Sequence, residues 1–226
     1  MDYKKFNEVF YKKLIYKLNY ENIDLLFCCE FGSRLWGYNN ENSDYDIKGI
    51  YIKKDKDYYK YLTFQNNYKD TIIFKFDIYD IELWDIRKVV YLYFTKHNQT
   101  PISWLLSDII YHKTEKSEIL KNFILEHNKC LHKDIIRHFF GLSISCLNTY
   151  KKNNKRYYLS LINLLIVEEY IKNKNIILNH DIKNINMDTI ELENRLKKVK
   201  EYIDKLKSKK FNFDNNWKSL IDIILK

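Results

Sequence analysis

Two aspartates one residue apart, Asp44 and Asp46, stand at the start of the β-branched run DYDIKGIYI. In an extended strand the side chains at positions i and i+2 project from the same face, so both carboxylates point one way. Carboxylates held this close raise each other's pKa unless a cation lies between them. Ligand sets made only of oxygen favour Mg²⁺ or Mn²⁺. The pair therefore predicts a divalent-metal site for phosphoryl or nucleotidyl transfer.

A glycine-serine turn precedes these aspartates, in a chain with only four glycines. Gly32 lets the backbone bend and approach a triphosphate, and the Ser33 hydroxyl with the neighbouring N–H groups can donate to phosphate oxygens. Arg34 adds positive charge beside them. No Gly-Lys-Ser/Thr follows, which excludes a P-loop of the kinase and ATPase kind. We expect Gly32, Ser33 and Arg34 to bind a nucleotide.

A third carboxylate on an adjacent strand would complete the metal site. The stretch FDIYDIELWD offers four candidates, which are Asp77, Asp80, Glu82 and Asp85. A shift of the strand register by one residue would move each of them to the other face of the sheet. The residues alone therefore leave the third ligand open.

The elements that must position these residues follow from hydrophobic periodicity. An apolar stripe predicts an amphipathic helix over residues 3–19, and strands are expected over 23–31, 44–52 and 71–83, with a polar excursion over 53–70. From Trp84 onward the period becomes helical, and Pro101 marks the next boundary. Further helical patterns cover residues 117–150, 155–173, 188–208 and 215–225. We expect a core over residues 1–113 and an α-helical region over 114–226.

The order of these motifs resembles the DNA polymerase β-type nucleotidyltransferase superfamily, with a Gly-Ser turn, a short loop and Asp-x-Asp on a strand. The fuller stretch, GSRLWG followed by SDYDIKGIYI and later by DIELWDIRK, is similar to one branch, the predicted nucleotidyltransferases of the RNA-repair-pathway DNA polymerase β family. That branch places a strand aspartate seven residues before an Arg-Lys pair, as Asp80 lies before Arg87 and Lys88. The resemblance covers residues 26–112 and is weaker beyond. It departs at residues 98–101, where the family has Asn-Pro, and at Ser103, where it has an acid.

The resemblance implies an α/β (α+β) fold, with a polymerase-β-like core on a small mixed sheet and a C-terminal helical region closing one side. It implies transfer of NMP from an NTP to a hydroxyl, with release of pyrophosphate. Asp44, Asp46 and Asp80 would be the catalytic residues and would hold Mg²⁺ or Mn²⁺, with Asp85 as the alternative third ligand. The acceptor could be an RNA 3′ end, such as that of a tRNA. The competing interpretations are an inactive nucleotide- or RNA-binding protein and a protein-AMPylating enzyme.

Three more basic residues are candidate nucleotide contacts. Lys88 opens a helix, where a cation opposes the helix dipole and therefore favours a phosphate or carboxylate partner. Lys155 and Arg156, at the start of a later helix, could reach a triphosphate or an RNA backbone. The formal charge of +9 lies mostly in residues 114–226, with 22 Lys and Arg against 14 Asp and Glu. Such an excess suits phosphate binding, although a solvated helix surface explains lysines equally well.

Composition limits the class of protein. Hydrophobic residues make up 46% of the 226, enough for a real core, and no stretch of about 18 apolar residues could span a membrane. The charged start MDYKKFNEVF lacks the apolar region of a signal peptide, so we expect a cytoplasmic protein without membrane contact. Four cysteines without C-x-x-C spacing, namely Cys28, Cys29, Cys130 and Cys146, predict reduced, mostly buried thiols.

Overall fold

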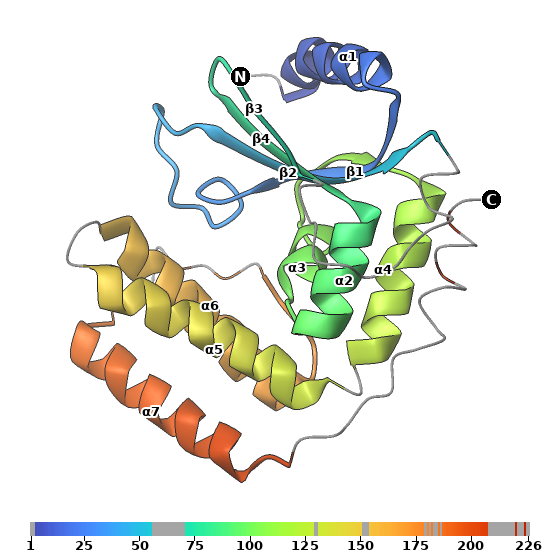
Figure 1. The fold of residues 1–226 in the computed structure, drawn as a ribbon. Helices are drawn as coiled ribbons and strands as arrows, with labels where there is room; N and C mark the ends of the chain where they lie inside the picture. The colour runs from blue at the N-terminus through green and yellow to red at the C-terminus, as the bar shows by residue number, and fades with distance from the viewer. Residues whose placement is uncertain are drawn as a thin grey trace.

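Five strands form one mixed sheet in the computed structural model of the chain (Figure 1). The structure describes residues 3–55, 71–128, 131–150, 154–178, 180, 182, 185, 187–207, 220 and 224. The strands are β1 (Ile23–Phe31), β2 (Tyr45–Lys53), β3 (Thr71–Phe76), β4 (Tyr79–Asp85) and β5 (Ile110–Lys113). Their order is β3-β4-β2-β1-β5, with β2 and β4 parallel and the other neighbours antiparallel.

Helix α1 (Tyr3–Tyr20) covers one face of the sheet (Figure 1). Its apolar stripe buries Leu14 and Leu18 against Ile47, Ile81 and Leu83 of the central strands. The stripe recurs at four-residue steps, which places these leucines on one side of the helix. The predicted N-terminal helix is therefore confirmed.

The other face of the sheet is covered by α2 (Ile86–Lys96), α3 (Thr100–Leu105) and α4 (Glu115–Asn128) (Figure 1). Helices α5 (His132–Thr149), α6 (Asn154–Asn173) and α7 (Thr189–Lys205) follow and pack on one another. One apolar cluster runs from Ile50 and Trp84 of the sheet through these helices to Ile203. The predicted α/β core followed by helices is confirmed, whereas the boundary at residue 113 stays a prediction.

Several predicted elements need correction. The strand expected over 71–83 is a hairpin, because Asp77 has a φ of +55° and reverses the chain between β3 and β4. Trp84 still belongs to β4, since the helical turn begins only at Ile86. The region predicted as helical over 117–150 is two helices, α4 and α5, and the short edge strand β5 was not predicted.

Some predictions fall outside the described residues. These are the polar excursion from residue 56 to 70, Cys130, and the last helix over 215–225 apart from Leu220 and Ile224. The other three cysteines are free and buried, as predicted. None of the helices in the described part of the chain is long and apolar enough to span a membrane.

Candidate active site

The acidic residues gather where three strand ends meet. Strand β1 ends at Phe31, opposite Asp46 near the start of β2, and Asp46 is in turn opposite Asp80 near the start of β4. Residues in register on neighbouring strands project from the same face, about 4.8 Å apart. The register therefore places the carboxylates of Asp46 and Asp80 side by side, and Asp44, two residues before Asp46, on the same face.

The glycine turn is built around the Asp46 carboxylate. Gly32 has a φ of +92°, and a Cβ added there would lie 2.2 Å from Asp46 Oδ2. Only glycine leaves room for the carboxylate in this turn. The turn is closed by backbone N–H groups of Trp36 and Tyr38, which donate to the carbonyl oxygens of Gly32 and Ser33. The sequence predicted space for a phosphate here; the structure shows that the same glycine also makes space for a carboxylate.

Asp46 is half-buried among like charges. Burial raises the pKa of its carboxyl, Lys48 and Lys155 lower it, and Asp80 and Asp44 raise it again, so that the pKa lies above its ordinary value. Among the residues that the structure describes, no side chain donates a hydrogen bond to the carboxylate of Asp46 or Asp80. These two acids are held together by the strands and not by a protein cation.

Asp44 differs from the other two acids because it already has a cationic partner. Its Oδ2 lies 3.1 Å from Nζ of Lys75, which projects from β3 beside Asp80. In the described part of the chain, no three His, Cys, Asp or Glu side chains are placed so that they could hold a metal ion together. Asp46 and Asp80 are neighbours by register, and Asp44 would have to exchange Lys75 for a metal to join them.

Glu30 of β1 supports the site from the sheet face that α1 covers and was missed in the sequence. Its buried carboxylate accepts hydrogen bonds from the backbone N of Asp46, at 2.9 Å, and from the Tyr111 hydroxyl, at 2.6 Å. Burial raises the pKa of Glu30 to about 7, although both donors oppose the rise. The signal was a charged residue near the end of the apolar run LLFCCEF.

Arg34 braces the loop that leads to the aspartates. Its guanidinium donates to the carbonyl oxygens of Ser43, at 2.7 Å, and Asp44, at 3.3 Å, and lies 3.6 Å from the centre of the Tyr45 ring. Ser33, beside it, is buried. The nucleotide-binding roles of Gly32, Ser33 and Arg34 stay predictions. In the structure, the Arg34 guanidinium holds the loop before β2 in place.

The start of α6 lies near the aspartates. Lys155 is close enough for its charge to lower the pKa of Asp46, and the Tyr158 ring stacks on Tyr38, with 5.8 Å between ring centres. The Tyr38 hydroxyl is buried and has no hydrogen-bond partner among the described residues. A ligand that enters beside Asp46 could supply one. Residues of the helical half thus contact the turn region of the sheet.

Three other candidates lie elsewhere. Asp85, at the far end of β4, is fully buried and caps α2, because its Oδ1 accepts from the backbone N and the Nε of Arg87. Lys88 bonds to the Thr71 hydroxyl and packs on Trp84. Arg156 points to Cys146 of α5. The structure does not bring these residues to Asp46.

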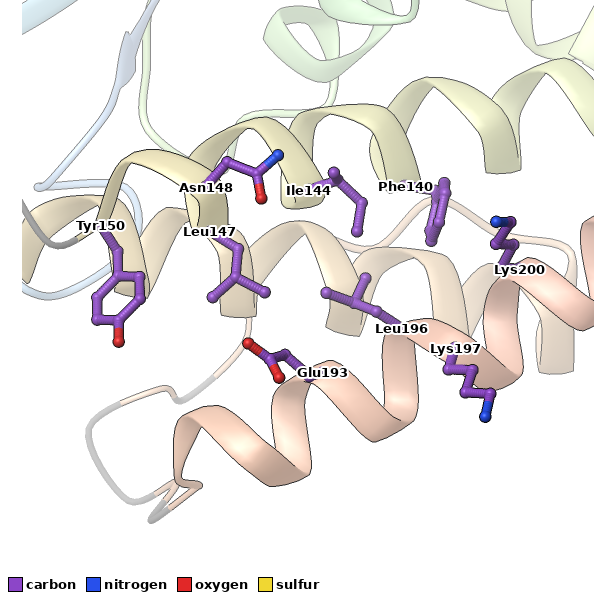
Figure 2. A pocket seen from close by; sticks show the side chains of 9 residues that line it. All are labelled: Phe140, Ile144, Leu147, Asn148, Tyr150, Glu193, Leu196, Lys197 and Lys200. Atoms are coloured by element: carbon purple, nitrogen blue, oxygen red, sulfur yellow. The ribbon is translucent and has the colours of Figure 1, made fainter.

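A cavity of about 540 Å³ between α5 and α7 is separate from the aspartates (Figure 2). Ile144, Leu147 and Leu196 form its apolar floor, and Lys197 and Lys200 stand at its rim. All of its lining residues come from these helices or from Tyr150 just after α5. The cavity therefore offers no carboxylate of the sheet to a ligand.

The chemistry of the donor set fits a divalent cation. Asp46 and Asp80 offer only carboxylate oxygens, and the charge of Asp80 is one cause that raises the pKa of Asp46. Mg²⁺ and Mn²⁺ accept such ligands and typically take about one or two carboxylates together with substrate phosphates. A cation between these strands would remove the repulsion that the register imposes.

A protein family matches most of this chain. The chain matches the RNA repair pathway DNA polymerase beta family over residues 7–221. It is 34% identical over 91 residues to the uncharacterized protein YcgL of Bacillus subtilis (strain 168), covering 40% of this chain and 34% of that protein. It is 28% identical over 153 residues to the uncharacterized protein 062L of Invertebrate iridescent virus 6, covering 54% of this chain and 84% of that protein.

The chain spans about a third of the length of the Bacillus relative. No solved structure matches the chain. The family match, in contrast, includes the glycine turn, all three aspartates and the helices as far as α7. The chain belongs to the RNA repair pathway DNA polymerase β family.

Proposed function

We propose that the protein is a metal-dependent nucleotidyltransferase that transfers NMP from an NTP to a hydroxyl acceptor, with an RNA 3′ end as the favoured acceptor. The observation that carries this proposal is the register of Asp46 and Asp80 beside the Gly32 turn. Two acids held together without a protein cation suit a reaction whose substrate arrives with a metal. The family match supports the same class of reaction.

The chain's own residues would act mainly by positioning and by charge. Asp46 and Asp80 would hold Mg²⁺ or Mn²⁺, and Asp44 would join them after leaving Lys75. The bound metal would neutralise charge on the phosphates and lower the pKa of the acceptor hydroxyl. Gly32 and Ser33 would contact the β and γ phosphates, and Lys155 would add positive charge from α6.

The reaction itself is a substitution at the α-phosphorus. The acceptor oxygen forms a bond to that phosphorus, while the bond to the oxygen that bridges to the β-phosphorus breaks. The electron pair leaves with pyrophosphate, and the acceptor's proton passes to Asp80. No oxidant or reductant is needed.

One observation favours a second candidate, a nucleotide- or RNA-binding protein that performs no transfer. The ammonium of Lys75 forms an ion pair with the Asp44 carboxylate. Among the described residues, no three side chains are placed to bind a metal ion together. If Lys75 stays on Asp44 when an NTP binds, the metal set remains incomplete. Nucleotide would then be bound without being consumed.

A labelling experiment separates these candidates. Purified protein is incubated with each α-³²P-labelled NTP, Mg²⁺ or Mn²⁺, and either a pool of RNA oligonucleotides or a protein lysate. Label on RNA supports the proposal, label on protein supports an AMPylating enzyme, and binding without transfer supports the second candidate.

Two variants make this experiment specific to the site. Asp46→Asn keeps the size of the side chain and removes its charge, so it should abolish transfer. Asp108→Asn makes the same change at an exposed aspartate in the loop before β5 and should leave transfer unchanged. Equal transfer by both variants would refute the role assigned to Asp46.

A further inference from the structure

Helix α1 presents a stripe of lysine and tyrosine to solvent. Lys12, Lys13, Tyr16, Lys17 and Tyr20 follow one another at one- to four-residue steps, and all five are exposed. Tyr16 and Tyr20 keep 79% and 88% of their surface accessible, although tyrosine usually buries much of its ring. Residues 11–20 contain no acidic side chain. We call these five residues the Lys-Tyr stripe.

The stripe borders a hollow between α1 and β3. This cavity of about 480 Å³ is lined by Lys12, Lys13, Leu14, Tyr16, Lys17, Phe74, Lys75 and Ile81. Four of these described lining residues are lysines and none is acidic, although the ammonium of Lys75 itself lies at Asp44. Lys17 is fixed at the hollow by its ammonium group, which lies 4.6 Å from the centre of the Phe74 ring. The lining therefore concentrates positive charge beside aromatic rings.

Lys75 connects the hollow to the candidate active site. It lines the hollow, and its Nζ is also 3.1 Å from Asp44 Oδ2. It lies opposite Asp80 in the hairpin of β3 and β4. The hollow lies on the α1 face of the sheet and the aspartates project from the opposite face, so a chain of phosphates from the Lys-Tyr stripe would pass around the edge strand β3 at Lys75 to reach them.

We propose that the Lys-Tyr stripe and the hollow bind the single-stranded RNA segment that precedes the acceptor's 3′ end. This inference rests on the proposed function, because it names the surface that would hold the acceptor. Proteins bind single strands by combining a basic groove for the backbone with exposed aromatic rings on which bases stack. The stripe offers both, and Lys75 on the edge strand β3, which bonds to Asp44, marks where the bound strand would turn around the sheet toward the aspartates.

The same features favour a single strand over other anionic partners. A duplex hides its bases and would leave the rings of Tyr16 and Tyr20 without a stacking partner. An acidic peptide would use the lysines but has no flat bases for the tyrosines. The lysines of α7 at the other cavity, Lys197 and Lys200, lie beside apolar lining residues such as Leu196, with no described exposed tyrosine pair like that of α1 (Figure 2).

Fluorescence anisotropy of the full chain with a labelled single-stranded RNA of about 12 nucleotides tests this surface without any NTP. Lys12→Ala with Lys13→Ala should weaken binding and reduce the slope of log affinity against log salt by about 1.4. Tyr16→Ala with Tyr20→Ala should weaken binding at least about tenfold and leave that slope nearly unchanged. The matched control, Lys197→Ala with Lys200→Ala, should bind as the wild type does.

Binding of a fluorescent NTP with Mn²⁺, measured on the same variants, distinguishes the two proposals. Stripe variants that bind NTP normally but no longer bind RNA would support the proposed RNA-binding surface. RNA binding equal to wild type in both stripe variants would overturn it, and so would equal affinity for a duplex of the same sequence. A wild type that binds RNA through the stripe but fails to bind NTP would instead contradict the proposed function.

Discussion

Strands β2 and β4 carry acidic residues in two regions that the protein treats differently. Near their starts, Asp46 and Asp80 lie side by side with no hydrogen-bond donor among the described side chains. Farther along β4, Glu82 lies 3.1 Å from the ammonium of Lys48 and accepts from the Trp84 indole, and Asp85 caps α2. The same strands thus hold acids that the fold satisfies and acids that have no described side-chain donor. We expect acids of the second kind to mark the site.

The largest expected effect comes from removing a charge at Asp46 or Asp80. Asp46→Asn or Asp80→Asn should lower the rate of NMP transfer by at least about 10³-fold, because the metal loses a charged ligand. Stability should not fall, since each change removes repulsion between like charges. Transfer rates and thermal unfolding, measured on the same preparations, check the expected loss of transfer and the expected unchanged stability. A variant that keeps most of its transfer rate would contradict the account.

The second prediction moves the Asp46 carboxylate without removing it. Gly32→Ala should lower transfer about 10²-fold, because the new methyl group would lie 2.2 Å from Asp46 Oδ2 and the backbone has a φ of +92°. Gly49→Ala is the matched control, since its Cβ would lie 2.6 Å from the carbonyl oxygen of Phe27 inside the sheet. It should lower the free energy of unfolding but leave the transfer rate of the folded protein unchanged. Equal effects of both on transfer would remove the special role of Gly32.

The third prediction concerns Asp85, an acid whose hydrogen bonds are satisfied within the fold. Asp85→Ala should lower the free energy of unfolding by about 1 to 3 kcal/mol, because α2 loses its cap and Arg87 loses its partner. Urea unfolding measures this loss. NTP and Mn²⁺ binding should persist in the folded variant. If binding disappeared while stability was unchanged, Asp85 would belong to the site.

The fourth prediction concerns His138, which lies outside the candidate site. His138 in α5 has a buried Nε2 with no partner among the described residues, and burial lowers the pKa of its ring from 6.5 to about 4. Because the folded protein favours the neutral ring, the free energy of unfolding is highest above pH 6.5. It falls as the pH falls toward 4, where the ring takes up a proton. The free energy of unfolding of His138→Leu should therefore rise by about 3 kcal/mol relative to that of the wild type between pH 6.5 and 4. Urea unfolding at several pH values tests this, and parallel curves for both proteins would contradict it.

The sequence predicted the parts of the site that depend on local chemistry. The Gly-Ser turn, the Asp-x-Asp strand and the strand of Asp80 could be located because turn residues and alternation act over a few residues. The roles of Asp44, Asp46 and Asp80 in metal binding remain predictions. The hairpin at Asp77 was missed because nothing but the positive φ of one aspartate reverses the chain there.

Partners distant in sequence could not be predicted. Glu30 meets Tyr111, Lys75 meets Asp44, and Tyr158 meets Tyr38 only after the sheet and helices have packed. Lys88 stays a predicted nucleotide contact, and nothing in the sequence indicated that its ammonium lies on the Trp84 ring and bonds to the Thr71 hydroxyl. Single-residue patterns carry no information about such contacts.

Metal-dependent stability tests the difference between the two regions most directly. Thermal unfolding is followed with and without saturating Mn²⁺ and a non-hydrolysable NTP, for wild type, Asp46→Asn and Asp85→Ala. We predict a rise in Tm of about 5 °C or more for wild type and for Asp85→Ala, whose starting Tm is lower, and no rise for Asp46→Asn. An equal rise in Asp46→Asn, or its loss in Asp85→Ala alone, would contradict the assignment of the site to the start of β2 and β4.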